Sequence, residues 1–388
     1  MSNTQKKNVP ELRFPGFEGE WEEKKLGEVG TFTSGGTPLK SKSEYWNGDI
    51  PWITTGDIHN IKRENITNFI TEKGLNESSA KLITNEAILI AMYGQGKTRG
   101  MSAILNFEAT TNQACAIYQT NQNINFVFQY FQKLYEFLRS LSNEGSQKNL
   151  SLSLLKEITL NYPNEQEQKK IGDFFSKLDR QIELEEQKLE LLQQQKKGYM
   201  QKIFSQELRF KDENGNDYPD WTNENFKDLF KVVPSKKYQI KSSEIIESGK
   251  IPVVDQGKKL ILGFSNQTDK VYKEFNNVII YGDHTTIIKK MDVPFIIGGD
   301  GVKLLTPISN NNLDYFFSIL QYFNIESEGY KRHFSILKDK NFYTANSNKE
   351  QQKIGCFFKY LDLIINKQFT YLELLKSYKK GIIQKMFV

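Results

Sequence analysis

The sequence predicts an α+β protein made of two copies of one unit, in which two similar globular domains are joined by two long helices that pair as a coiled coil. Three observations predict this architecture. The sequence repeats itself, and each copy of the repeat ends in a segment with heptad periodicity. Within each globular part, short strand-like runs separated by turns precede an aromatic, helix-like segment.

The repeat is clearest at the end of each copy, where residues 167–204 and residues 350–387 align without a gap at an offset of 183 residues. The starts also match, because Leu12-Arg13-Phe14 and Trp21 correspond to Leu208-Arg209-Phe210 and Trp221. By this symmetry we expect the end of the second long helix to lie near the N-terminus. The first-copy residues that meet identical residues include Ile171, Gly172, Phe174, Phe175, Leu178, Asp179, Glu190, Leu191, Leu192, Gly198 and Phe204.

Both terminal segments of the repeat carry apolar residues at alternating spacings of four and three. Two amphipathic helices that pack only on their own domains are the alternative, but a period held over five heptads in both copies favours a coiled-coil pair. Polar residues interrupt both seams at the same two places, Glu185 and Lys196 in one and Gln368 and Lys379 in the other. The predicted segments are a first domain at 1–163, a first helix at 164–207, a second domain at 208–346 and a second helix at 347–388.

The strand-like runs lie between turn signals such as Asn47-Gly48 and Gly298-Gly299. Each globular part then ends in a segment rich in Phe and Tyr, whose helical spacing is more typical of a core than of a binding platform. These aromatic segments are residues 126–141 and 313–323, and the strand-like runs are residues 87–92, 114–119, 277–281, 294–297 and 302–306.

Composition excludes several classes of protein. The chain has 388 residues, no apolar run of transmembrane length and no apolar segment near the N-terminus, so neither a membrane span nor secretion is expected. The two cysteines exclude a disulfide framework and a structural zinc site, and a cytoplasmic protein fits. The net charge of +5 comes entirely from residues 347–388, so an interaction with nucleic acid has to rest on local clusters.

The octapeptide AMYGQGKT (91–98) looks like a permissive phosphate-binding loop after a strand. The residues that follow predict a turn and a strand, whereas a phosphate site needs a helix N-terminus. The second copy also has Asp283-His284-Thr285-Thr286 at this place. A surface turn is therefore favoured, and an ATP- or GTP-using enzyme remains the alternative.

No other catalytic constellation is apparent. There is no glycine-rich loop for S-adenosylmethionine, no Asn-Pro-Pro-aromatic tetrapeptide of the kind that methylates a flipped base, and the three histidines lie in separate segments. We therefore expect a non-enzymatic chain without a cofactor or a metal of its own.

Polar and basic loop residues remain as candidates for nucleic-acid contacts, since phosphates are bound by Lys, Arg and hydroxyls, and bases by Lys, Arg, Gln, Asn or Thr. A solvated surface charge is the alternative for any single one. The first-domain candidates are Lys40, Lys42, Thr54, Thr55, His59, Tyr93, Gln95, Lys97, Arg99 and Lys148. The second-domain candidates are Lys236, Lys237, Gln256, Lys258, Lys259, His284, Thr285, Thr286, Lys289, Lys290, Lys331, Arg332 and His333.

The repeat, together with several motifs, resembles the specificity subunit of Type I restriction–modification systems over nearly the whole chain. Residues 12–21, the run Ser34-Gly35-Gly36-Thr37-Pro38 and residues 48–58 are similar to the start of its first target recognition domain. Residues 87–100 and 145–151 and the run Glu167-Gln168-Lys169-Lys170-Ile171 are similar to its later landmarks. The second copy departs more, with Gly329-Tyr330-Lys331-Arg332 in place of the Gly-Ser-Gln pattern.

This resemblance implies that each globular domain reads one half of a split, asymmetric double-stranded DNA target. It implies that the two helices pair antiparallel and set the gap between the half-sites. It also implies two methyltransferase subunits and additional restriction subunits as partners, with S-adenosylmethionine, ATP and Mg acting on those partners. A coiled-coil scaffold that binds only proteins is the alternative.

Overall fold

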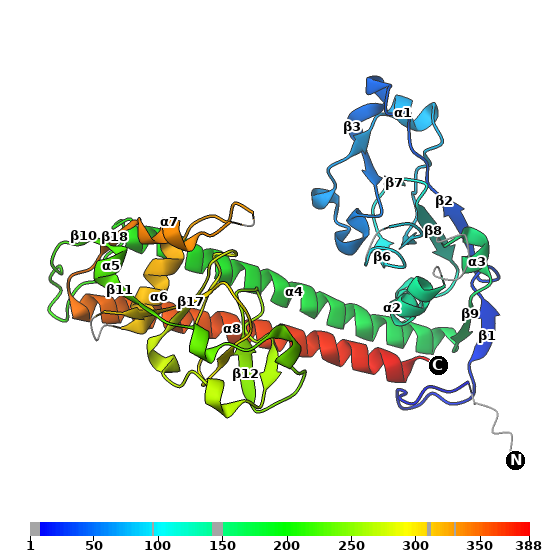
Figure 1. Ribbon diagram of the computed structural model, residues 1–388. Helices are drawn as coiled ribbons and strands as arrows, with labels where there is room; N and C mark the ends of the chain where they lie inside the picture. Colours follow the sequence, from blue (N-terminus) through cyan, green and yellow to red (C-terminus); the bar gives the residue numbers. More distant parts are fainter. Residues whose placement is uncertain (1–7, 95–96, 142–149, 309–311, 330) are drawn as a thin grey trace, which may run out of the picture. The chain divides into compact units, whose positions relative to one another are not determined.

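The computed structural model describes residues 8–94, 97–141, 150–308, 312–329 and 331–388 (Figure 1). The chain divides into a first unit, Met1–Glu186 with Tyr371–Val388, and a second unit, Gln187–Thr370. Each unit therefore contains one globular domain and one segment of each long helix. Among the described residues, no helix is long and apolar enough to cross a membrane.

The first unit contains three small sheets. The strands β1 (Glu22–Lys25) and β9 (Thr159–Tyr162) form an antiparallel pair, and a four-stranded antiparallel sheet has the order β2-β8-β5-β6. A three-stranded sheet has the order β4-β3-β7, and β3 runs parallel to β7. The bounds are β2 (Gly30–Ser34), β3 (Trp46–Ile53), β4 (Phe69–Ile70), β5 (Ala87–Ala91), β6 (Ser102–Leu105), β7 (Thr110–Thr111) and β8 (Cys115–Thr120), with helices α1 (Glu72–Asn76), α2 (Ile124–Ser140) and α3 (Leu152–Lys156) and short 3-10 helices at Ser43–Tyr45, Asp57–Asn60 and Arg63–Asn65.

The second unit repeats this topology strand for strand. Its pair is β10-β18, its four-stranded sheet has the order β11-β17-β14-β15, and its three-stranded sheet has the order β13-β12-β16 with β12 parallel to β16. The bounds are β10 (Thr222–Asn225), β11 (Phe230–Val233), β12 (Ile251–Val254), β13 (Gly263–Ser265), β14 (Ile279–Gly282), β15 (Ile288–Lys289), β16 (Ile296–Ile297), β17 (Val302–Pro307) and β18 (Asn341–Thr344), with helices α5 (Phe226–Leu229), α6 (Leu313–Tyr322) and α7 (Phe334–Lys338) and 3-10 helices at Lys236–Tyr238, Ser242–Glu244, Thr268–Lys270 and Phe275–Asn277. The predicted α+β repeat is confirmed.

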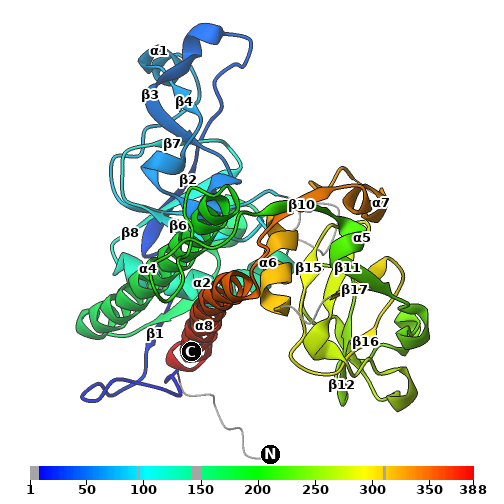
Figure 2. The ribbon, with the colours of Figure 1, turned by 90° about the vertical axis from the view of Figure 1, so that its left-hand side faces the viewer.

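The aromatic helices α2 and α6 are part of the core, as their spacing predicts. Phe126 and Phe131 of α2 and Tyr315 of α6 are fully buried. Figure 2 shows α6 beside α8, with β12 and β16 at the far side of the same unit. In each unit a glycine of the long helix lets the start of the aromatic helix come close. In the first unit, a Cβ at Gly172 of α4 would lie 2.4 Å from Oδ1 of Asn123, the residue before α2. In the second unit, a Cβ at Gly355 of α8 would lie 2.8 Å from the backbone N of Tyr315 in α6.

The two heptad segments form the long helices α4 (Glu165–Phe204) and α8 (Asn348–Met386). In the first unit, Lys379 pairs with Asp179 at 2.5 Å and Lys376 pairs with Glu186 at 2.8 Å. In the second unit, Lys196 pairs with Asp362 at 2.6 Å, and the rings of Tyr199 and Phe357 meet edge to face. In both units the residue numbers rise along one helix as they fall along the other, so the segments pair antiparallel.

The polar seam positions Lys196 and Lys379 are equivalent residues of the repeat, and each forms an ion pair with an equivalent aspartate. Their side chains are only about 15% exposed, and further polar groups complete the contacts. Gln129 donates to Asp179 in the first unit, and Lys196 donates to Gln321 in the second. A polar pair in an apolar seam favours one register over others, because a shifted register leaves a charge without its partner.

Reversing one charge of this pair is expected to destabilise the first unit. We expect Asp179→Lys to lower the free energy of unfolding by about 2 kcal/mol, because two cations then face each other in a mostly buried seam. Adding Lys379→Asp should restore part of the loss. Urea unfolding of the single and double variants measures both effects. The matched control is the Glu186–Lys376 pair, whose side chains are nearly half exposed, and for which the same reversal should cost less than about 1 kcal/mol.

The segment before β1 ties the start of the first domain to the end of α8. The backbone N–H of Leu12 donates to Lys385 O at 2.9 Å, so the predicted proximity of the N-terminal segment and the second helix is confirmed. The equivalent bond in the second unit runs from Leu208 N to Lys202 O at 3.0 Å, in the segment that connects α4 to β10. We call the segment before β1 (residues 8–21) and the segment before β10 (residues 205–221) the straps of the two units.

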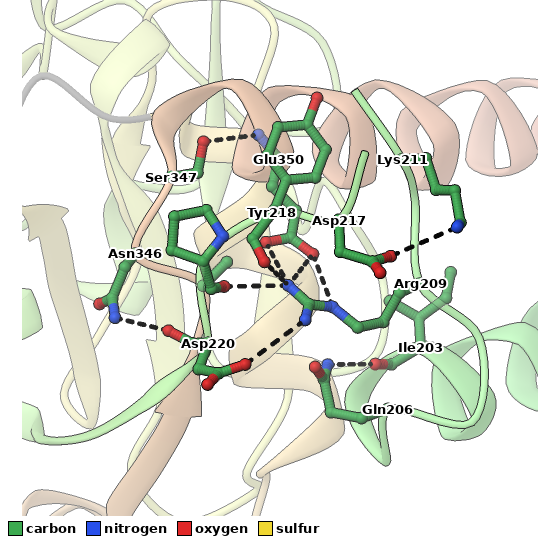
Figure 3. Close-up of polar contacts among 12 residues, drawn as sticks. Ile203, Gln206, Arg209, Lys211, Asp217, Tyr218, Asp220, Asn346, Ser347 and Glu350 are labelled. Carbon is green, nitrogen blue, oxygen red and sulfur yellow. Dashed lines mark hydrogen bonds and ion pairs between the residues drawn. The ribbon is translucent and has the colours of Figure 1, made fainter. Parts of the chain in front are cut away.

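An arginine clamp holds the strap against the first turn of the long helix in each unit. Arg13 donates to both carboxylate oxygens of Glu167 at 2.7 Å. Arg209 likewise donates to both oxygens of Glu350 at 3.2 Å and to the carbonyls of Tyr218 and Pro219 (Figure 3). Both glutamate side chains are almost completely buried. Burial raises the pKa of Glu350, and the hydrogen bonds and charge of the neighbouring groups oppose that shift.

Candidate nucleic-acid interface

In the second unit, polar loops converge on the turn Gly298–Gly301, which follows β16. Because β12 and β16 are parallel, their carboxyl ends lie at the same edge, and Gly298 N donates to Val254 O at 2.9 Å. The backbone at Gly301 has φ +82°, and a Cβ there would lie 2.6 Å from Gln256 Nε2. The glycines therefore allow both the turn and the close approach of the neighbouring loop.

One side of this turn borders an open groove of about 600 Å³ that carries three lysines. Its acidic groups are already engaged: Gln239 donates to Asp300 at 2.9 Å, and Gln267 donates to Glu244 at 2.8 Å. Hydrogen bonds from the backbone N–H of Lys241 and from Gln267 lower the pKa of Glu244. The groove thus combines ammonium groups with amides, which is the set that phosphate and base contacts use. Its polar lining residues are Lys236, Gln239, Lys241, Ser242, Glu244, Gln267, Lys270 and Asp300.

On the other side of the turn, several predicted residues come together around Gln256. The side-chain oxygen of Gln256 accepts a hydrogen bond from the backbone N–H of His284 at 3.0 Å. The backbone carbonyl of Gln256 accepts a hydrogen bond from the hydroxyl of Thr285 at 2.5 Å. The ring Nδ1 of His284 lies 3.0 Å from Lys331 O. Residues far apart in the sequence therefore meet at one edge. Among the other predicted residues of this unit, Lys237, Lys258, Lys259, Lys331 and Arg332 are exposed.

Four predicted residues of the second unit have internal partners instead. Lys289 is buried and donates to the carbonyls of Asp255 and Lys259, and burial lowers its pKa. His333 is fully buried, and its Nε2 accepts the backbone N–H of Glu328 at 3.1 Å. Thr286 is buried with φ +57°, and Lys290 is half-buried beside Asp314. These side chains support the loops rather than face solvent.

The first unit has the same arrangement around the turn Asn112–Ala114, which follows β7. Asn112 N donates to Ile53 O and Met92 N donates to Ala114 O, both at 2.9 Å, so the loops after β3 and β5 meet this turn. The hydroxyl of Thr37, in the loop after β2, donates to Gln113. The turns in the two units are thus topologically equivalent, but they carry different polar side chains.

The predicted residues of the first unit take varied positions. Lys40, His59 and Lys97 are exposed, Tyr93 is 38% exposed, and Thr55 and Arg99 are half-buried. Thr54 donates to Asp57 at 2.8 Å, and Lys42 donates to the Tyr45 hydroxyl at 2.6 Å. Gln95 and Lys148 lie outside the described residues.

The segment 91–98 is not followed by a helix. The described residues after it lead through a turn into β6, which pairs antiparallel with β5. The described residues after this segment therefore provide no helix N-terminus for a nucleotide phosphate, and the surface turn stays a prediction. Among the described residues, no group of His, Cys, Asp and Glu side chains could hold a metal ion.

Sequence reasoning missed the residues of the central turns and their partners. These are Thr37, Asn112 and Gln113 in the first unit and Gln239, Lys241, Gln267, Lys270 and Asp300 in the second. The available signal was a polar or glycine-rich run directly after a short strand, namely Asn112–Gln113 after β7 and Gly298–Gly301 after β16. The pairing of β3 with β7 and of β12 with β16, which makes these turns central, is a long-range contact.

The sequence profile of the Type I restriction modification DNA specificity domain matches the chain twice, at residues 18–194 and 218–374. The chain belongs to this family. Each match covers one globular domain and most of the long helix after it, which agrees with the internal repeat. The resemblance noted from the sequence is therefore confirmed.

Relatives of known name support this family. The chain is 27% identical over 290 residues to the Type I restriction enzyme MjaIX specificity subunit of Methanocaldococcus jannaschii, covering 70% of this chain and 66% of the relative. It is 33% identical over 168 residues to the EcoR124I/EcoR124II specificity subunit of Escherichia coli, covering 42% of each chain. The matches thus span less than two thirds of these relatives.

A solved structure of the same family has the same fold. The crystal structure of the Type I restriction–modification S subunit from M. genitalium matches with a TM-score of 0.66 at 17% identity, over 98% of this chain and 99% of that one. At this identity the match concerns the fold, and it agrees with two α+β domains and two long helices.

Proposed function

We propose that this chain is the non-catalytic DNA-reading subunit of a Type I restriction–modification enzyme, and that each globular domain reads one half of a bipartite, asymmetric target. One observation carries the proposal: the two units place equivalent loops around equivalent turns but equip them differently. The first unit has Thr37 and Gln113 at the centre, and the second has Gln239 and Asp300 beside a lysine-lined groove. The same backbone arrangement with two different sets of polar side chains would recognise two different half-site sequences.

The partners we propose are two methyltransferase subunits, joined by restriction subunits. Exposed apolar side chains outside the paired seams support protein partners, since such residues gather at interfaces. They include Leu184, Leu191, Tyr360, Leu363, Leu374 and Tyr378 of the two long helices, each between 47% and 65% exposed. In this proposal, S-adenosylmethionine, ATP and Mg act on those partners.

Replacing the second domain with a second copy of the first tests whether the domains are separate readers. In this chimera, residues 12–163 stand in place of residues 208–346. We expect the methylated target to become an inverted repeat of the first half-site, because each unit places its domain in the same way on its own segments of the two helices. The replacement is compatible with packing, since Phe204, at the end of α4, corresponds to Phe387, directly after α8, and each packs in the core of its own unit.

The measurement is methylome sequencing of a host that carries the chimera and the methyltransferase subunits, beside the same host with the natural chain. A chimera that assembles but keeps the natural target would contradict separate readers. A natural complex that shows no salt-dependent, sequence-preferring DNA binding would instead favour a scaffold that binds only proteins.

A further inference from the structure

The loop Asp255–Leu262, between β12 and β13, exposes three consecutive aliphatic side chains. Leu260 is 51%, Ile261 37% and Leu262 43% exposed. The connection between β3 and β4 in the first unit behaves differently, because Ile58 and Ile66 are buried and Ile61 is half-buried, so none of its isoleucines is exposed. The exposed aliphatic tip is therefore specific to the second domain and is not a general feature of the fold.

The loop is held in place from inside the domain. The buried ammonium of Lys289 donates to the carbonyls of Asp255 and Lys259 and lies 3.5 Å from the Asp255 carboxylate. The backbone N–H of Gly257 donates to the same carboxylate at 2.9 Å. An apolar tip on a supported loop can be presented to a ligand with little ordering cost.

The position and charge of the loop indicate what would cover the tip. Leu262 lies against the central turn of the candidate interface, since a Cβ at Gly298 would be 3.5 Å from its Cδ2. From Gln256 to Gln267 the only charged residues are Lys258 and Lys259, which are exposed next to the tip. Exposed lysines beside an apolar tip match duplex DNA, in which anionic phosphates flank a stack of bases that apolar side chains can contact.

We propose that Leu260 and Ile261 make an apolar contact with the bases of the half-site read by the second domain, while Lys258 and Lys259 contact the flanking phosphates. This inference rests on the proposed function. Apolar side chains contact bases either at the thymine methyl group in the major groove or as a wedge in the minor groove. In both cases the contact adds affinity that salt does not screen.

The test uses the complete complex of this chain with its methyltransferase subunits and a duplex carrying the target mapped by methylome sequencing. Binding is measured by fluorescence anisotropy at several salt concentrations. We expect L260S/I261S to weaken DNA binding about tenfold, and this factor should be the same at every salt concentration. K258Q/K259Q should also weaken binding, but should lower the slope of log affinity against log salt by about two. V293S is the control, because Val293 is a similarly exposed aliphatic residue of the same unit, and it should bind as the natural chain does.

Duplexes with deoxyuridine in place of thymine distinguish the two grooves. A loss of affinity in the natural complex that is absent in L260S/I261S supports a thymine methyl contact, and no loss supports the minor-groove wedge. Natural affinity of L260S/I261S would overturn the inference, as would loss of methyltransferase subunits from that variant, because the tip would then serve a protein interface. A natural complex that does not prefer its target would overturn the proposed function itself.

Discussion

Adding one heptad to each long helix is expected to lengthen the spacer of the methylated target by up to about three base pairs. The ion pairs Asp179–Lys379 and Lys196–Asp362 define which residues face each other within each unit. Glu186 is the last residue of the α4 segment in the first unit, and Thr370 is the last residue of the α8 segment in the second unit. A heptad inserted after each of these two residues keeps the seams in phase and leaves the pairs Asp179–Lys379 and Lys196–Asp362 in place. Each insertion lengthens its helix by about 10 Å, whereas DNA rises about 3.4 Å per base pair.

Methylome sequencing of a host carrying the lengthened chain measures the spacer, and the half-site sequences should stay as they are. The control inserts two residues at each position, which turns the apolar stripe by roughly half a turn and should destabilise the chain without a new spacing. If the heptad variant assembles and still methylates the original spacing, the helices do not set the distance, and the methyltransferase subunits must do so.

Removing the arginine of the second clamp is expected to destabilise the second unit by about 3 kcal/mol. Arg209→Met leaves the carboxylate of Glu350 buried without its cation, and an uncompensated buried charge is among the costliest single changes. The control is Lys211→Met in the same strap, where Lys211 pairs with Asp217 (Figure 3). Both of these side chains are more than 60% exposed. Urea unfolding should show less than about 1 kcal/mol for that variant.

The cost of Arg209→Met should depend on pH in a defined direction. Burial raises the pKa of Glu350 above its ordinary value of 4.5, and without Arg209 a major opposing influence is gone. The folded variant then binds a proton more readily than the unfolded chain. The loss relative to the natural chain should therefore be full above the folded pKa of the variant and should shrink as the pH falls through it. A loss that stays constant over this range, or that persists unchanged in R209M/E350Q, would contradict the assignment to the buried charge.

The repeat and the helices could be predicted because their signals are local and periodic. An ungapped offset of 183 residues relates the ends of the two copies, and a spacing of four and three places each apolar stripe on one helical face. The matching polar interruptions at Lys196 and Lys379 are visible in the sequence for the same reason. Family membership also follows from the sequence, since the motifs that carry it are continuous runs of residues.

The candidate interface could be predicted only in part, because the type of a residue does not determine whether its side chain is exposed. Lys258 and Lys289 look alike in the sequence, yet one lies in solvent and the other supports a loop from inside. His333 likewise stands in a basic cluster, Lys331-Arg332-His333, but its ring is buried and accepts a backbone hydrogen bond. Tertiary packing decides such cases, since a buried polar group needs partners that come from distant segments.

The sequence by itself therefore determined the two-fold repeat, the helix pair and the family, since each depends on periodic or continuous residues. Only the tertiary structure showed that Asn112–Ala114 and Gly298–Gly301 are equivalent centres of the two domains. Those turns become central through the parallel pairing of β3 with β7 and of β12 with β16, whose partners lie more than 40 residues apart. Contacts between strands so far apart leave no local pattern, because backbone hydrogen bonds between them form regardless of most side chains.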